Sequence, residues 1–520
     1  MRYSIQLVQK HRRYQMKKEL DTRRCGVLIH PTSFPSPFGI GDFGKEAREV
    51  LMMLAKAKVS LWQILPLGPT GFGDSPYAAR STFAGNELLI DLRSLDQTFG
   101  IGKTYQDPDN RTTGRVDYTW VYEHKMPLLK EAAQLFIDCG SSKDTYKTFC
   151  EKNAWWLDDY ALYQALVNHF NDSRWFLWED GLKTRKKTVL AKWRKTLAPQ
   201  VEVYKVLQFF FFTQWNSLHE YANSLGIRII GDIPIYVAGD SVDAWTNPRL
   251  FKIDAQGNQT AQAGCPPDAF TALGQLWGNP VYNWPVHKED DYAWWRKRME
   301  MTLKLVDIVR IDHFRGFESY WEVPAGAENA VNGQWVPGPG MDLLKHFKDL
   351  NVIGEDLGFL TPAVAAMKKK SGFPGMKIAQ FAWDYSKGYY DSENAYLPHN
   401  FENNCVAYTG THDNETTRGW YNSLNDQYKD LVRRYFQSPD EDIVWQMIRG
   451  LLASAANTVV IPMQDIIGLD NSARMNMPSF VGSCNWSWRY DPSTMQDWMM
   501  PRLKEFIHLY GREQLESWNI

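Results

Sequence analysis

Three carboxylates follow apolar, strand-like runs in the second half of the chain. They are Asp312 after residues 306–311, Glu355 after residues 351–354, and Asp413 after residues 405–411. A parallel α/β barrel gathers the C-terminal ends of its strands at one mouth, so we expect the three side chains to share a pocket. Paired carboxyl groups can cleave a glycosidic bond, because the leaving oxygen needs a proton and the sugar cation needs a negative partner. The pattern predicts an enzyme that acts on sugars.

Asp312 has a cationic neighbour two positions earlier, Arg310. Strand alternation places both side chains on the same side of the sheet. A nearby cation favours the ionised carboxylate, which is the form that a nucleophile needs. The alternative interpretation is a structural ion pair at the end of a strand.

Glu355 and Asp413 also allow two interpretations each. Glu355 could hold a proton if it is partly desolvated, or it could share a helix N-cap with Asp356. His412, beside Asp413, could donate to a sugar hydroxyl, but either residue alone would more often serve in a cap or turn. Three carboxylates at three strand ends favour the catalytic interpretation.

Short apolar runs bounded by turn signals predict eight strands. The runs cover residues 26–29, 61–65, 227–233, 306–311, 352–354, 377–381, 405–411 and 459–463. Most alternate with helical patterns, for example at 45–56, 341–350, 361–370, 427–436 and 440–456. This alternation predicts an α/β protein with a (β/α)8 TIM barrel.

The spacing of the runs predicts large, mostly helical insertions at the C-terminal face of the barrel. We expect a catalytic barrel over residues 25–520, interrupted by inserted subdomains at about 68–226 and 238–300. Residues 1–24 are basic and lack the apolar core of a secretory signal, so we expect a loosely packed N-terminal extension.

Composition argues against several classes of partner. Lys and Arg total 58 against 60 acidic residues, which leaves no basic excess for nucleic acid. The mean hydropathy is −0.44, and no apolar run reaches the length of about 18 residues that a membrane span needs. The six cysteines form no CxxC pair, which favours reduced thiols and a cytoplasmic protein, or a plastid protein if the source is a plant or alga. Aromatic residues make up 14% of the chain, and those in loops suit either sugar stacking or loop packing.

Motifs for phosphate, metal or serine chemistry are weak or missing in the sequence. Gly39, Gly41 and Gly44 match the GxGxxG spacing, but three prolines separate them from the preceding strand-like run, which excludes a dinucleotide fingerprint. The sequence contains no GxxxxGK[ST], HExxH or GxSxG motif, and its 11 histidines lack ligand spacing. We therefore expect no metal and no cofactor.

The chain resembles the 4-α-glucanotransferase family of the α-amylase clan, also known as amylomaltases or disproportionating enzymes, from about Cys25 to the C-terminus. The segments that carry the resemblance are residues 26–33, 62–67, 74–77, 231–237, 274–280, the motifs around Arg310 and Glu355, and residues 411–414. The resemblance implies that Asp312 is the nucleophile, Glu355 the general acid/base and Asp413 the stabiliser of the distorted sugar. It also implies retention of anomeric configuration and transfer between α-1,4-glucans or maltooligosaccharides.

The same resemblance implies a set of substrate contacts. Tyr77 would stack on the sugar at the cleaved bond, and the other implied contacts are Ser75, Asp232, Arg310, His412 and Asn476. Residues 263–279 resemble the family's mobile loop, with Phe270, Gln275 and Trp277 as sugar contacts. The chain departs from the pattern at Ala269 and Ala272 in that loop, and at Ser36 and Ser479, where glycine is usual.

Two other functions remain open from the sequence. A retaining α-1,4-glucan hydrolase would need the same carboxylates, and a catalytically inactive glucan-binding barrel would keep the fold. The sequence gives no prediction of oligomeric state.

Overall fold

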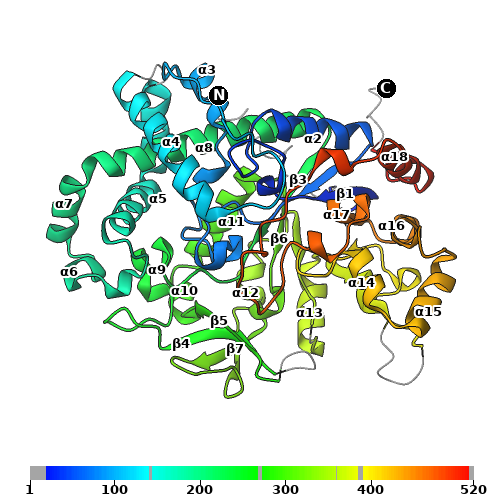
Figure 1. Ribbon diagram of the computed structural model, residues 1–520. Helices are drawn as coiled ribbons and strands as arrows, with labels where there is room; N and C mark the ends of the chain where they lie inside the picture. Colours follow the sequence, from blue (N-terminus) through cyan, green and yellow to red (C-terminus); the bar gives the residue numbers. More distant parts are fainter. Residues whose placement is uncertain (1–18, 140–142, 268–271, 359, 384–389, 515–520) are drawn as a thin grey trace, which may run out of the picture.

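The centre of the protein is a curled sheet of eight parallel strands (Figure 1). The structure is a computed structural model that describes residues 19–139, 143–267, 272–358, 360–383 and 390–514. The strands follow the order β10-β11-β12-β1-β2-β3-β6-β9. Their bounds are Arg24–Leu28 (β1), Leu61–Gln63 (β2), Arg228–Ile233 (β3), Ile308–Ile311 (β6), Val352–Gly354 (β9), Gly375–Ile378 (β10), Cys405–Tyr408 (β11) and Thr458–Pro462 (β12).

These eight strands confirm the eight predicted runs and the barrel. Between the two end strands, β9 and β10, the Gly354 N–H donates to the Pro374 carbonyl at 3.0 Å, so the sheet is nearly closed. Strand β11 ends three residues before its predicted end. The hydroxyl of the next residue, Thr409, instead donates to Asp465 at 2.5 Å, and the chain turns toward Asp413.

Helices cover the outside of the barrel. In α2 (Lys45–Lys56) the buried residues Ala47, Val50, Leu51 and Leu54 follow the helical period, so one apolar stripe faces the core. The other main helices around the barrel are α11 (Ala293–Leu305), α12 (Met341–Leu344), α13 (Pro362–Ser371), α14 (Thr417–Ser423), α15 (Asp426–Phe436), α16 (Ile443–Ala453), α17 (Met463–Ile467) and α18 (Met499–Leu509).

One helix is shorter than predicted. The pattern predicts a helix over 341–350, but α12 ends at Leu344. The N–H groups of His346, Phe347 and Leu350 each bond a carbonyl three residues back, so tight turns replace the α-helical pattern.

Long helices fill the first insertion, as predicted. They lie on the left of Figure 1 and are α4 (Tyr118–Cys139), α5 (Lys143–Phe170), α6 (Asp180–Lys183), α7 (Lys187–Thr196) and α8 (Ala198–Ser224). Phe210 and Phe211 of α8 are fully buried, and α5 and α8 pack along each other. Phe210 and Phe211 belong to the core of the barrel, whereas buried residues of α5, α6 and α7 form a second hydrophobic cluster.

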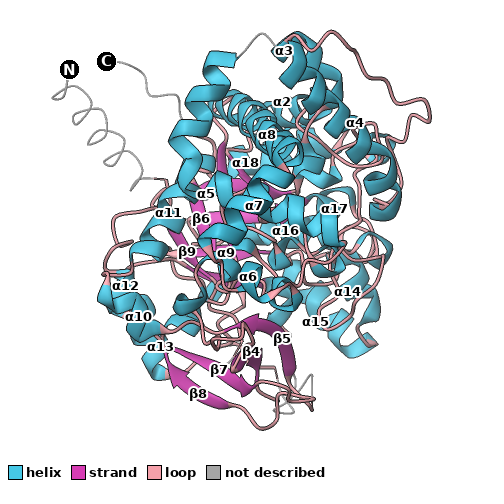
Figure 2. Ribbon diagram, turned by 90° about the vertical axis from the view of Figure 1, so that its left-hand side faces the viewer, coloured by secondary structure: helices cyan, strands magenta, loops and turns pink. Residues whose placement is uncertain are grey.

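A second, antiparallel sheet is not predicted by the sequence pattern, and it adds four strands to a fold whose insertions are otherwise helical. Its order is β5-β4-β7-β8, with bounds Ala261–Cys265 (β4), Gln275–Pro280 (β5), Ser319–Pro324 (β7) and Gln334–Pro337 (β8). The sheet lies at the lower edge of the molecule in Figure 2. These strands are short, partly exposed and contain Gly or Pro, so they lack the apolar runs that mark the barrel strands.

The barrel begins earlier than the predicted boundary between residues 24 and 25. Leu20 is buried in the core, Arg24 starts β1, and Arg23 donates to the carbonyls of Leu452 and Ser454. Residues 19–24 are therefore packed against the barrel, while residues 1–18 lie outside the described part.

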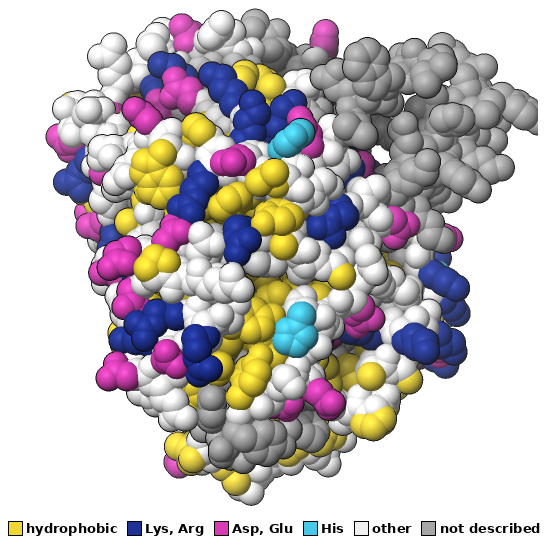
Figure 3. All heavy atoms as spheres, turned by 90° about the vertical axis from the view of Figure 1, so that its right-hand side faces the viewer, with side chains coloured by type: hydrophobic (Ala, Val, Ile, Leu, Met, Phe, Trp, Pro, Cys, Tyr) yellow, Lys and Arg dark blue, Asp and Glu magenta, His cyan; other side chains and the backbone are white. Residues whose placement is uncertain are grey.

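Charged side chains of both signs are interspersed on the face shown in Figure 3. No large region of that face carries a single sign, in keeping with the near balance of charges in the sequence. Within the described residues, none of the helices combines the length and apolarity needed to cross a membrane.

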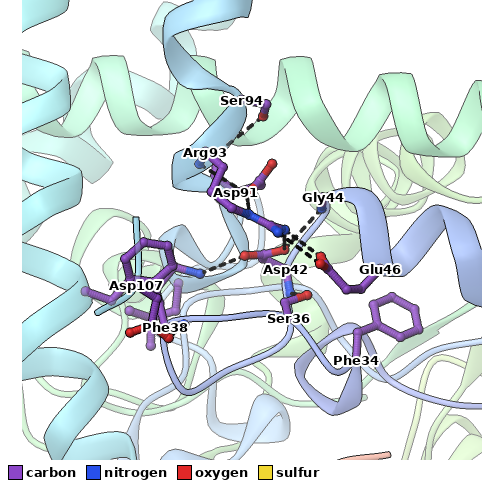
Figure 4. Close-up of polar contacts among 12 residues, drawn as sticks. Phe34, Ser36, Phe38, Asp42, Gly44, Glu46, Asp91, Arg93, Ser94 and Asp107 are labelled. Carbon is purple, nitrogen blue, oxygen red and sulfur yellow. Dashed lines mark hydrogen bonds and ion pairs between the residues drawn. The ribbon is translucent and has the colours of Figure 1, made fainter. Parts of the chain in front are cut away.

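A buried charge network fixes the segment with the GxGxxG spacing (Figure 4). Asp42 accepts the Gly44 N–H at 3.1 Å and pairs with Lys125 at 3.4 Å, and neither charged side chain is exposed. Arg93 contacts the Asp91 carboxylate at 3.1 Å and bonds Glu46 at the start of α2. Burial raises the pKa of Asp42 to about 7, although Lys125 opposes that shift. The segment thus anchors α2 and the first insertion.

We predict that Lys125→Met lowers the free energy of unfolding by about 3–5 kcal/mol at pH 8, because it removes the cation that opposes the raised pKa of the buried Asp42 carboxyl group. The loss should be larger at pH 8 than at pH 5. A folded pKa above the unfolded value means that the native state binds more protons, so stability falls as pH rises from the unfolded pKa of 3.8 through the folded pKa. Urea unfolding of the wild type and the variant at both pH values measures this loss.

Two further variants control this prediction. Asp42→Asn combined with Lys125→Met should recover most of the loss, since no unpaired charge remains. Lys103→Met breaks an exposed pair with Glu131 and should cost less than about 1 kcal/mol. Equal losses for Lys125→Met and Lys103→Met would contradict the buried-pair account.

Candidate functional site

A cleft of about 740 Å³ opens where the C-terminal ends of the barrel strands meet the two insertions. Nine of the twelve predicted site residues line it: Ser75, Tyr77, Gln275, Trp277, Asp312, Glu355, His412, Asp413 and Asn476. Arg310 and Asp232 lie buried below these residues. Phe270, like Ala269, lies outside the described residues.

Arg310 joins two carboxylates at the floor of the cleft. Its Nη1 lies 2.6 Å from Asp232 Oδ2 and 3.0 Å from Asp312 Oδ1. Asp232 also accepts the Tyr77 hydroxyl at 2.8 Å. Arg310 and Asp232 are almost fully buried, whereas the Asp312 side chain is 29% exposed toward the cleft. The guanidinium therefore fixes the orientation of Asp312 from below.

Glu355 is held by backbone groups. Its Oε2 accepts the N–H of His313 at 2.8 Å, and its Oε1 accepts the N–H of Leu357 at 2.6 Å. His313 directly follows Asp312 and has a left-handed φ of 52°, which is uncommon for a residue other than glycine. This turn places Asp312 and Glu355 on the same wall of the cleft.

Asp312 and Glu355 both have a raised pKa. Burial is the main cause for each, and Asp232, Glu355 and Asp413 raise the pKa of Asp312 further. Arg310 lowers the pKa of both groups, but it contacts Asp312 directly. Because Glu355 contributes to the raised pKa of Asp312, the two carboxyl groups titrate as a pair. The Arg310 contact favours the state with Asp312 ionised and Glu355 protonated.

Asp413 projects from the loop after β11 and is held on two sides. Its Oδ1 accepts the Asn476 amide at 2.6 Å, and its Oδ2 lies 3.4 Å from His412 Nε2. Its side chain is 43% exposed, compared with 29% for Asp312. Burial lowers the pKa of His412, so its ring is neutral at neutral pH.

Aromatic rings form one wall of the cleft. Tyr77 stacks on His412 with a centroid distance of 5.1 Å and an angle of 12°. Trp486 packs against both rings, at 5.7 Å from Tyr77 and 6.0 Å from His412. From strand β5 of the small sheet, the Trp277 ring meets the His313 ring edge-on at 4.8 Å. Flat faces of this kind suit the apolar faces of sugar rings.

Sequence reasoning missed two residues that help to shape the site. His313 lines the cleft and bonds Glu355 through its backbone, and its position next to Asp312 was the available signal. Trp486 supports Tyr77 and His412 although it lies far along the chain, and only its place in the polar, aromatic stretch 485–488 marked it.

Residues that could hold a metal ion do not gather in the described parts of the chain. No group of three His, Cys, Asp or Glu side chains there has ligand geometry. The carboxylates of the cleft instead bond arginine, amide and backbone donors.

The fold and the site together define a class: a carbohydrate-active barrel enzyme with three carboxyl groups in an aromatic cleft. Comparison with known proteins makes the assignment specific. A family model described as 4-alpha-glucanotransferase matches residues 29–495. The chain belongs to the 4-alpha-glucanotransferase family.

Relatives from distant organisms match nearly the whole chain. The 4-alpha-glucanotransferase of Streptococcus pneumoniae is 44% identical over 499 residues, which cover 94% of this chain and 97% of that protein. The Thermus thermophilus protein of the same name is 43% identical, with 91% and 96% covered. The chloroplastic/amyloplastic 4-alpha-glucanotransferase of Solanum tuberosum is 40% identical, with 95% and 87% covered.

A solved structure supports the fold over nearly the whole chain. The amylomaltase from Streptococcus agalactiae, solved in complex with acarbose, superposes with a TM-score of 0.89 at 38% identity. The match covers 95% of this chain and all of that chain.

We predict that Asp312→Asn lowers kcat/KM by about 10⁴-fold or more, because the amide cannot act as a nucleophile. The variant should keep or gain thermal stability. It removes a carboxyl group whose ionised form is disfavoured by burial, and Arg310 keeps its contact with Asp232. Activity assays and melting curves measure both effects. Near-normal activity would overturn the role of nucleophile, and a large loss of stability would favour a structural ion pair.

We predict a kcat/KM profile whose acid limb lies above pH ~4, the usual carboxyl pKa, because Asp312 must be ionised and its pKa is raised. Arg310→Lys should move that limb to higher pH, since lysine cannot make the two-sided contact of a guanidinium. An acid limb at or below the usual carboxyl pKa, or one that stays in place in Arg310→Lys, would contradict the role of the Arg310–Asp312 contact.

Proposed function

We propose that the protein is a retaining 4-α-glucanotransferase that cleaves an α-1,4-glucan and transfers the released segment to another glucan or to glucose. The single observation that carries the proposal is that the two carboxyl groups at the mouth of the barrel, Asp312 and Glu355, have different partners. Asp312 contacts a guanidinium, whereas Glu355 accepts only backbone N–H groups among the bonds described. Family membership supports the same reaction.

In the first half of the reaction, Asp312 attacks the anomeric carbon while Glu355 gives its proton to the departing glycosidic oxygen. The segment is then covalently attached to Asp312, and Glu355 is ionised. The sugar carries positive charge in the transition state, and Asp413 stabilises that charge from its partly exposed position.

In the second half, Glu355 takes the proton of the 4-hydroxyl of an incoming glucan. The resulting oxygen attacks the anomeric carbon and displaces Asp312, which forms a new α-1,4 bond with the original configuration. The outcome depends on whether a sugar or water arrives first, so transfer needs a held acceptor and a site that excludes water.

We assign the remaining predicted residues to substrate binding. Tyr77 stacks on the sugar at the cleaved bond, and Ser75, His412 and Asn476 hydrogen-bond it. Asp232 and Arg310, which the family resemblance predicts as direct contacts, are buried below the cleft and act through Tyr77 and Asp312. Gln275 and Trp277 of β5 line the cleft, and Gln275 accepts the Trp277 indole N–H at 3.1 Å. We assign both of them, together with Phe270, to sugar contact. No cofactor or metal enters this scheme.

We also propose that residues 25–520 act as one catalytic unit. The insertions at about 68–226 and 238–300 supply two walls of the cleft, since Tyr77 comes from the first and Trp277 from the second. We place the reaction in the cytoplasm, or in a plastid if the source is a plant or alga, as the name of the potato relative indicates for that protein. Maltooligosaccharides and α-1,4-glucans are the partners.

Incubation with maltotriose tests the proposed function. We expect glucose and longer maltooligosaccharides to form together, with little gain in reducing ends, because each cleavage is matched by a new bond. Product chromatography and a reducing-end assay measure this. Reducing ends that rise with every cleavage would favour the retaining hydrolase, and maltotriose that stays intact would favour the inactive glucan-binding barrel.

A further inference from the structure

A second hollow of about 310 Å³ adjoins the catalytic cleft, near the lower end of the size range of ligand pockets. It lies between the first insertion and the small antiparallel sheet. Its walls include Trp175, Phe176, Asn258, Gln259 and Ala325, none of which lines the catalytic cleft.

The two hollows share part of their walls. Gly239, Gln262 and Gly278 line both of them, so the second hollow continues from the first. A Cβ atom on Gly278 would meet no atom within 4 Å, and a Cβ atom on Gly239 would lie 2.3 Å from Gln259 Nε2. The missing side chains at both glycines therefore keep the passage open.

The walls of this hollow carry no charged side chain. An unscreened phosphate or carboxylate ligand would need a cation there, so the ligand must be neutral. Phe176 is half-buried against the core of the first insertion, and its neighbour Trp175 donates its indole N–H to the Gly239 carbonyl at 2.9 Å. The aromatic wall is therefore firmly placed.

Amide side chains line the same hollow as the aromatic wall. Gln259 donates to the Gly278 carbonyl at 3.1 Å, and Gln262 reaches the Pro324 carbonyl at 3.4 Å. In the part of the chain that the structure describes, the side-chain oxygens of both glutamines accept no hydrogen bond. An aromatic face opposite amide groups can contact the apolar face of a sugar and bond its hydroxyls.

We propose that this hollow is a distal subsite for glucose units of long α-1,4-glucan chains, reached through the passage between Gly239 and Gly278. The assignment rests on the proposed function, and it adds a preference for chain length. Short donors fill only the catalytic cleft, whereas long chains gain contacts with Phe176 and the amides beyond it.

Two variants test the distal subsite by opposite changes. Phe176→Ala removes the aromatic wall, and Ala325→Trp fills the hollow from an exposed position without removing any core contact. We expect both to lower kcat/KM for amylose roughly 3- to 10-fold, mainly through KM, as loss of one aromatic contact would. Transfer from maltotriose should change less than about 2-fold in both.

Leu177→Ala is the matched control, because Leu177 is 60% exposed, follows Phe176 and does not line the hollow. It should leave both donors unaffected. Equal losses on amylose and maltotriose, or no loss on amylose, would overturn the distal subsite while leaving the proposed function in place. If Phe176→Ala fails to fold, Ala325→Trp decides. If the wild type transfers nothing from either donor, the proposed function fails and the subsite falls with it.

Discussion

The contact between Arg310 and two carboxylates is the interaction on which the rest of the site depends. A buried guanidinium between Asp232 and Asp312 makes it possible to bury both acids at the barrel floor, where an unpaired carboxylate would be costly. Asp232 in turn accepts the Tyr77 hydroxyl, so the same charge cluster positions the aromatic wall. One arginine thus couples the fold of the barrel to the reactivity of Asp312 and to the shape of the sugar site.

The barrel was predictable because each buried parallel strand is apolar on both faces and therefore visible as a short run. The small sheet was not, since a strand such as Ala261–Cys265 depends on pairing with the distant segment Ser319–Pro324 rather than on its own composition. The site residues also divide into those visible in the local sequence and those that depend on tertiary packing. Asp312 and Glu355 could be placed from strand ends, whereas the support from Trp486 arises only from tertiary packing.

The two serines that replace the family's usual glycines have different consequences. Ser36 is buried, and its hydroxyl accepts the Asp42 N–H at 3.1 Å, a bond that glycine could not make. Ser479 is exposed at the rim of the cleft with a left-handed φ of 62°, where glycine would be less strained. Ser36 therefore adds a hydrogen bond to the network that anchors α2, and Ser479 leaves conformational strain at the rim of the cleft.

The backbone and the side chain of His313 contribute separately to the cleft. Glycine or asparagine at position 313 tolerates the left-handed φ of 52° and would present the same N–H, so the hydrogen bond to Glu355 survives those substitutions. The imidazole against Trp277 has no such protection, because it is lost with the first substitution. Natural or laboratory variation at this position can therefore explore how the cleft grips sugar while the proton-transfer machinery stays intact.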